Sequence, residues 1–234
     1  MSIRHYLISH AKNIKRGGTK FFMEKKEKEK MENLASEQKF YTYEDYLKIN
    51  DGNRYEIIHG RLYLKDEWGD MRTNTSKIEK VKMLAAPSVL HQEIVLEIGA
   101  QLKEKLKGKK CKTFVSPIDV ILNEENVVQP DIAVVCNDDI ITKKGIKGAP
   151  KVIIEVLSKG SIKNDKIAKY SLYMEYGVEE YIIINPLDKE IIECKLNSFG
   201  FYDTKKLNIT DDIILPECTI SLKDFYEQNP EYLK

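Results

Sequence analysis

One segment of the sequence is apolar at almost every position and still contains an acid: residues 151–157 read KVIIEVL. Because both alternating faces of this segment are apolar, it predicts a central β-strand that is covered on both sides. Glu155 shares a face with Ile153 and Leu157. Burying an unpaired ionised carboxylate costs several kcal/mol, so we expect Glu155 to be protonated, paired or bound to a metal ion.

The segments around this strand predict a mixed α/β (α+β) fold. Helices are predicted over 88–106, after the cap residue Ser88, and over 162–176, between Ser161 and Gly177, with short helices near 43–51 and after 221. Strands are predicted over 54–64 (a hairpin turning at 59–60), 80–86, 112–122, 127–136, 181–185, 191–196 and 200–202. The order of these elements predicts one mixed central sheet flanked by helices.

Charge is unevenly distributed along the 234 residues. Residues 1–40 contain ten lysines and arginines against five glutamates, whereas the remainder contains 28 basic and 32 acidic residues. We expect residues 1–38 to form a flexible basic arm, residues 39–228 a single domain and residues 229–234 a C-terminal tail. Phosphate neutralisation supplies most non-specific affinity for nucleic acid, so this slightly acidic body needs a basic patch, a metal ion or the arm to bind a polyanion.

The sequence does not predict a membrane protein or a disulfide scaffold. The longest apolar run, 132–136, has five residues, whereas a membrane-spanning helix needs about 18 or more. The N-terminus lacks the apolar core of a secretory signal. The four cysteines lie 25, 58 and 24 residues apart without a C-x-x-C pair. We therefore expect reduced thiols and a cytoplasmic location.

Acids in three consecutive predicted strands suggest a metal site. Asp119, Asp131 and Glu155 each interrupt an otherwise apolar strand. Two or three carboxylates are the ligands that Mg²⁺ or Mn²⁺ prefers, usually with several waters retained. In the alternative interpretation, Asp131 faces solvent at a strand end and Glu155 pairs with a lysine.

The helix after Glu155 offers a lysine at a suitable place. Asp165, Lys169, Tyr173 and Tyr176 follow one another at intervals of four, four and three residues, so they share one helix face. Pointed at the acids, the Lys169 ammonium could hold a phosphate oxygen or orient a water molecule. Alternatively, Asp165 and Lys169 form a surface pair worth about 0.2–0.5 kcal/mol, and the tyrosines only pack.

Two residues outside these strands are accessory candidates. Glu56 lies in the predicted hairpin and either approaches the metal or pairs with Arg54 or Arg61. His91 lies on the apolar face of the helix over 88–106, in its first turn. A buried histidine with a satisfied ring is the commoner outcome at such a position, and a role in the site is the alternative.

An ordered set of motifs resembles a known nuclease family. Pro130-Asp131, followed 24 residues later by Glu155, resembles the PD-(D/E)XK nuclease signature. The wider chain, about residues 40–225, resembles the Uma-two family of restriction endonucleases within that superfamily. The matching stretches are YEIIHGRL at 55–62, Pro87-Ser88 with His91, VQPDI at 128–132, IEVLS at 154–158, the helix with Asp165, Lys169 and Tyr173 continuing to Gly177 and Tyr181, and 215–225.

This resemblance implies a restriction-endonuclease-like core in which Asp131 and Glu155 bind Mg²⁺ or Mn²⁺. The carbonyl of Val156 is implied as a possible further ligand. The superfamily places a lysine two residues after the glutamate, and Leu157 stands there in this chain. Lys169 is the expected substitute, with Lys159 as the competing candidate.

The resulting functional hypothesis is a divalent-metal-dependent DNA endonuclease that hydrolyses phosphodiester bonds by in-line attack of water. The main alternative, motivated by Leu157 and the acidic body, is a catalytically degenerate module that binds nucleic acid or protein. A weaker alternative is hydrolysis of another phosphate compound, such as RNA or a nucleotide. A homodimer is expected because enzymes that cut both strands commonly work as symmetric pairs; no particular residue points to it.

Overall fold

The computed structural model describes residues 39–65, 88–158 and 165–233, and of these the side chains of residues 165–167 are not described. The predicted basic arm, the strand at 80–86, Lys159 and the cap at Ser161 lie outside the described residues. No described helix is both long enough and apolar enough to cross a bilayer.

The first sheet has six strands with the predicted central strand in its interior. β9 (Val152–Val156) runs parallel to β10 (Glu180–Asn185) and antiparallel to β6 (Ile132–Val135), and all its residues are buried. The prediction of a strand covered on both sides is therefore confirmed. The full order is β12 (Tyr202–Asn208), β11 (Glu190–Leu196), β10, β9, β6 and β3 (Lys112–Val115).

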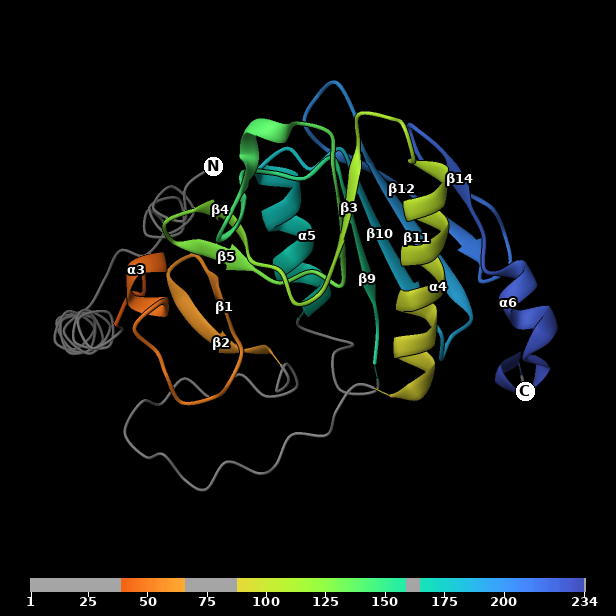
Figure 1. Cartoon of the computed structure of the whole chain (residues 1–234), viewed down its shortest axis with the longest axis horizontal. Coiled ribbons are helices and arrows are strands. Elements are labelled where there is room, and N and C mark those ends of the chain that lie inside the picture. The colour runs from red at the N-terminus through yellow and green to blue at the C-terminus, as the bar shows by residue number, and fades with distance from the viewer. Residues whose placement is uncertain (1–38, 66–87, 159–164, 234) are drawn as a thin grey trace, which may run out of the picture. The chain divides into compact units, whose positions relative to one another are not determined.

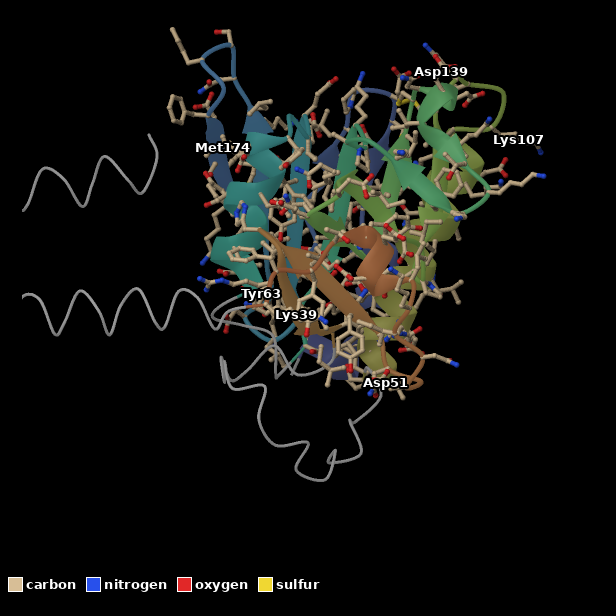
Figure 2. All side chains as sticks on the ribbon, turned by 90° about the vertical axis from the view of Figure 1, so that its left-hand side faces the viewer. Lys39, Asp51, Tyr63, Lys107, Asp139 and Met174 are labelled. Carbon is tan, nitrogen blue, oxygen red and sulfur yellow. A yellow bond between two sulfur atoms is a disulfide. The ribbon has the colours of Figure 1, made fainter. Side chains whose placement is uncertain are left out.

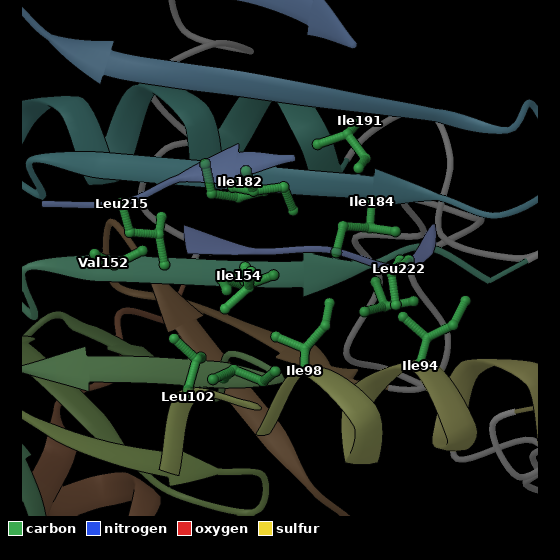
Figure 3. Close-up of a cluster of buried hydrophobic side chains, with 14 of the residues drawn as sticks. Ile94, Ile98, Leu102, Val152, Ile154, Ile182, Ile184, Ile191, Leu215 and Leu222 are labelled. Carbon is green, nitrogen blue, oxygen red and sulfur yellow. The ribbon is translucent and has the colours of Figure 1, made fainter. Parts of the chain in front are cut away.

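Helix α4 (Val89–Lys105) covers one face of this sheet, on the right in Figure 1. Ser88 caps it as predicted, because the Ser88 hydroxyl accepts the N–H of His91 at 3.2 Å. Figure 3 shows the side chains that join this helix to the sheet and to the C-terminal segment: Ile94, Ile98 and Leu102 of α4, Val152, Ile154, Ile182, Ile184 and Ile191 of the sheet, and Leu215 and Leu222.

Helix α5 (Asp165–Glu175) lies on the opposite face of the sheet. Its buried residues Leu172 and Tyr173 belong to the same apolar cluster as Ile153 and Leu157. Alternate residues of β9 therefore face α4 and α5. Glu155 shares the parity of Ile153, so its side chain lies on the α5 side.

A second six-stranded sheet was not anticipated, and it corrects the expectation of one central sheet. The predicted strands at 112–122 and 127–136 each divide between the two sheets, breaking around Pro117 and Pro130. Proline lacks the N–H that a strand ladder needs, which explains both breaks. The second sheet has the order β2 (Arg61–Leu64), β1 (Tyr55–Ile58), β5 (Asn126–Val128), β4 (Val120–Asn123), β8 (Gly145–Lys147) and β7 (Ile141–Thr142).

The predicted hairpin forms the edge of this second sheet. β1 and β2 pair in antiparallel register around His59 and Gly60, which have φ of 50° and 72°. Two consecutive positive φ values are typical of the tight turn that matches strand twist. A Cβ at Gly60 would lie 2.6 Å from the Phe40 ring. Figure 2 looks onto this hairpin and onto helix α3 (Tyr43–Tyr46), both in orange.

The remaining elements are short. Thr42 and Asp45 form a capping box at the start of α3, and this helix ends earlier than predicted. The chain continues through β13 (Ile213–Ile214), β14 (Thr219–Ile220) and α6 (Lys223–Gln228), and the 3₁₀ helices are η2 (Asp138–Ile140) and η3 (Pro230–Leu233).

Two cysteines depart from the expectation of four reduced thiols. β3 and β6 are antiparallel neighbours with Lys112 opposite Val135, so Cys111 and Cys136 come next to each other and form a disulfide. Cys194 and Cys218 are free thiols, the first buried and the second half-buried. Sequence spacing could not reveal the bond because it follows from strand register.

Candidate active site

Strand pairing brings Asp131 and Glu155 to the same edge of the first sheet. In the β6–β9 register Ile132 lies opposite Ile154, so the next pair outward is Asp131 and Glu155. The N–H of Val156 donates to Asp131 Oδ2 at 2.9 Å. Both carboxylates belong to side chains in the interior, since each residue is 7% exposed.

His91 contacts the same oxygen of Asp131 as the Val156 N–H does. Its ring Nε2 lies 3.2 Å from Asp131 Oδ2, so this oxygen has two partners while no described residue donates a hydrogen bond to Oδ1. Burial raises the pKa of Asp131, but the hydrogen bond with His91, the positive charge of Lys65 and the Val156 N–H outweigh burial. The pKa of Asp131 therefore lies below its ordinary value, and the side chain is a carboxylate at neutral pH.

Glu155 accepts two hydrogen bonds from helix α5. The Lys169 Nζ lies 2.9 Å from Glu155 Oε1, and the Tyr173 hydroxyl donates to the same oxygen at 3.3 Å. Burial raises the pKa of Tyr173 well above its ordinary value; Lys169 opposes this and the nearby Glu155 and Glu56 carboxylates add to it. Tyr173 therefore remains a protonated donor at neutral pH.

Lys169 also binds the carboxylate of Glu56, which comes from the hairpin. The Lys169 Nζ lies 3.0 Å from Glu56 Oε1, and the backbone N–H of Gln129 donates to that oxygen at 2.7 Å. Glu56 thus pairs with Lys169, and neither Arg54 nor Arg61 contributes the pairing considered from the sequence. Among the described residues, Glu56 Oε2 and His91 Nδ1 are buried without a hydrogen-bond partner.

Asp119 is linked to Glu56 through Gln129 and forms no hydrogen bond with the described atoms of Asp131, Glu155 or Lys169. Its Oδ1 accepts from Gln129 Nε2 at 2.8 Å and from the Tyr46 hydroxyl at 3.2 Å. Burial, with the Asp119 charge as the next cause, raises the pKa of Tyr46 to about 12. The expected meeting of acids from three strands of one sheet is therefore corrected: the third acid near Lys169 is Glu56, from the second sheet. The side chain of Asp165 lies outside the described residues.

Leu157 occupies the position of the superfamily's lysine for a local reason. Its side chain is buried in the apolar cluster beneath α5, and its N–H donates to Ile184 O at 2.8 Å. An amine there would displace core packing, whereas Lys169 reaches Glu155 from the helix above. The Val156 N–H is the atom observed at Asp131; the role of the Val156 carbonyl stays a prediction.

Asp131 and Glu155 resemble the open set of carboxylates that usually holds Mg²⁺, rather than a site closed entirely by protein ligands. Mg²⁺ in proteins is usually held by one or two carboxylates, with waters and substrate phosphates completing its octahedron. Asp131 and Glu155 supply this number of carboxylates, and Asp131 Oδ1 accepts no hydrogen bond from a described residue. No group of three histidine, cysteine, aspartate or glutamate side chains suited to a metal ion occurs within the part of the chain that the structure describes.

The sequence did not predict the polar contacts that three residues, Tyr173, Gln129 and Lys65, make near the site. Tyr173 was expected to pack, and it does lie 4.9 Å from the Tyr181 ring, between centroids, but its hydroxyl also contacts Glu155. Its place four residues after Lys169 was the available signal. Gln129 directly precedes Pro130-Asp131, whereas nothing in the sequence pointed to Lys65.

The fold of this chain is similar to that of a protein described as a putative nuclease. That protein, from Anabaena variabilis, belongs to DUF820, and its crystal structure matches with a TM-score of 0.59 at 18% identity, over 80% of this chain and 97% of that one. Residues 79–222 match the model of the Uma2 family, described as "Putative restriction endonuclease", and the chain belongs to that family. A search of curated proteins finds no match.

Proposed function

We propose that this protein is a divalent-metal-dependent endonuclease that hydrolyses phosphodiester bonds in DNA. The observation that carries the proposal is the placement of Asp131 and Glu155 as a cross-strand pair, with Lys169 against Glu155. Membership of the Uma2 family, described as "Putative restriction endonuclease", supports the reaction class.

Asp131 and Glu155 are the residues that would hold Mg²⁺ or Mn²⁺, and the carbonyl of Val156 is a further candidate ligand. When bound, such an ion polarises a phosphoryl oxygen and makes bound water more acidic. His91 and the Val156 N–H together occupy Asp131 Oδ2, which orients Oδ1 for a cation.

Lys169 acts on Glu155 in this proposal. Its ammonium and the Tyr173 hydroxyl both bind Glu155 Oε1 and so restrict the rotation of that carboxylate. Glu56 also binds the Lys169 ammonium, and the Gln129 N–H holds Glu56. This chain of contacts connects the hairpin to the acid pair.

The second candidate function is a degenerate module that binds nucleic acid or protein without cutting. Leu157 at the usual lysine position is the observation that favours it, together with ion pairs that already satisfy Lys169. Hydrolysis of RNA or of a nucleotide uses the same chemistry and is distinguished by the choice of substrate.

Cleavage of supercoiled plasmid tests the proposal. The wild-type chain should nick or cut with Mg²⁺ or Mn²⁺ and stop when chelator is added. Asp131→Asn and Glu155→Gln preserve side-chain volume and should abolish cutting. Glu193→Gln is the matched control, because Glu193 is similarly buried on β11 of the same sheet. Folded acid variants that cut as well as wild type would refute the proposal, and absence of calorimetric Mg²⁺ and Mn²⁺ binding would favour the module.

A further inference from the structure

Two lysines lie near the acid cluster, which consists of Glu56, Asp131 and Glu155. Their surroundings differ. Lys169 is 2% exposed and forms ion pairs with Glu56 and Glu155. Moving its ammonium toward a substrate would leave two buried carboxylates without their cation, which is strongly unfavourable. Lys169 is therefore a positioning residue for Glu155 and is poorly placed to bind a substrate phosphate.

Lys65 directly follows strand β2 and is half-buried. Its backbone N–H donates to Arg54 O at 2.9 Å, which continues the hairpin ladder. Its Nζ donates to the backbone carbonyl of Gln129 and approaches the Ser116 hydroxyl at 3.4 Å. Both partners are neutral, and among the described residues no carboxylate forms an ion pair with this ammonium. Its charge is thus available to an anion.

The two partners of Lys65 flank Asp131. Gln129 precedes Asp131 by two residues, and the Ser116 N–H donates to the Asp131 carbonyl at 2.9 Å. The positive charge of Lys65 also acts on the Asp131 carboxylate, whose pKa it lowers. The ammonium consequently stands on the Asp131 side of the acid pair, whereas Lys169 stands on the Glu155 side.

We propose that Lys65 binds a backbone phosphate of the nucleic-acid substrate beside Asp131. This inference rests on the proposed function, since it assigns a substrate contact to the same site. A lysine ammonium is a compact charge with three donors, and its long stem allows it to exchange the Gln129 carbonyl for a phosphate oxygen. The work of the superfamily's lysine is then divided: Lys169 orients an acid, and Lys65 contacts the substrate.

Binding measured without cleavage tests this role directly. The full chain is titrated, without added metal and over a series of salt concentrations, against a fluorescein-labelled DNA duplex read by anisotropy. Removing one phosphate contact decreases the magnitude of the negative slope of log affinity against log salt by about 0.9. We expect that decrease, with weaker binding, in Lys65→Gln, and a slope near wild type in Lys65→Arg, which keeps the charge. Lys223→Gln, on the exposed face of α6, is the control.

A cleavage assay distinguishes an error in the Lys65 role from an error in the proposed nuclease function. With Mg²⁺, Lys65→Gln should lose about tenfold or more in kcat/KM while its thermal unfolding midpoint stays at the wild-type value, and Lys65→Arg should recover most of the loss. If wild type cuts DNA and Lys65→Gln shows unchanged salt slope and kcat/KM, the Lys65 role is overturned and the nuclease function stands. If wild type neither cuts DNA nor binds Mg²⁺ or Mn²⁺, both are overturned.

Discussion

The amine of Lys169 lies 2.9 Å from Oε1 of Glu155, although the two residues come from a helix and a strand and are 14 positions apart in the chain. The same amine reaches Glu56, 113 positions away. One buried cation therefore connects both sheets through two carboxylates. This relationship governs both the stability of the site and its geometry.

Replacing Lys169 by methionine should destabilise the fold strongly. The substitution keeps the length and apolar stem of the side chain but leaves Glu56 and Glu155 buried without their cation, a change that typically costs about 3–5 kcal/mol. Urea unfolding measures the free energy. Lys223→Met, at an exposed lysine, should change it by less than about 0.5 kcal/mol. A Lys169→Met protein as stable as wild type would contradict the buried ion-pair assignment.

Removing the His91 ring should weaken metal binding more than folding. His91 occupies one oxygen of Asp131, and loss of such a partner to a metal-binding carboxylate commonly lowers metal affinity by about 10–100-fold. Isothermal calorimetry with Mn²⁺ on His91→Ala measures the affinity. A variant that keeps wild-type Mn²⁺ affinity would show that His91 is only a core residue.

Acidification should remove a stabilising contribution of Asp131. Its pKa in the folded protein is lower than its ordinary value of 3.8, because contacts with His91, Lys65 and the Val156 N–H outweigh burial. A carboxylate shifted in this direction stabilises the fold fully above its ordinary pKa, and the contribution disappears as the pH falls through the folded pKa. Unfolding of wild type and Asp131→Asn between pH 7 and pH 2 should show a shallower loss of stability in the variant. Parallel curves would contradict the assignment.

The disulfide between Cys111 and Cys136 should be detectable by thiol counting. Denatured protein alkylated without reductant should expose two reactive thiols, Cys194 and Cys218, and four after reduction. Closing a loop of this length stabilises a fold by about 3.5 kcal/mol in the chain-entropy treatment. Cys111→Ser combined with Cys136→Ser should therefore unfold at lower urea. Four reactive thiols before reduction would contradict the bond.

The central strand, the helix α4 and the hairpin could be predicted because each has a local signal. β9 is apolar on both faces, Ser88 caps a periodic helix, and the turn at His59-Gly60 needs positive φ. The division into two sheets could not be predicted, since it depends on where the chain leaves one ladder after Pro117 and Pro130.

The residues that meet at the candidate site could be predicted where a sequence motif contained them. Pro130-Asp131 and Glu155 follow a recognisable spacing, and Lys169 lies on the correct helix face. The contact between Lys169 and Glu56 has no periodic signal, because it joins segments that meet only after both sheets have formed. Lys65 also has no periodic signal, because its partners, a backbone carbonyl and a hydroxyl, belong to segments that are distant in the sequence.

The residues of the acid cluster come from both sheets. β6 and β9 supply Asp131 and Glu155, whereas the hairpin of the other sheet supplies Glu56 and, just beyond β2, Lys65. In the proposed enzyme the acid pair and the substrate contact thus come from different sheets, and the ion pairs of Lys169 with Glu56 and Glu155 join the two. A change in the hairpin that moves Glu56 would therefore reach Glu155 through Lys169, so the two sheets constrain each other.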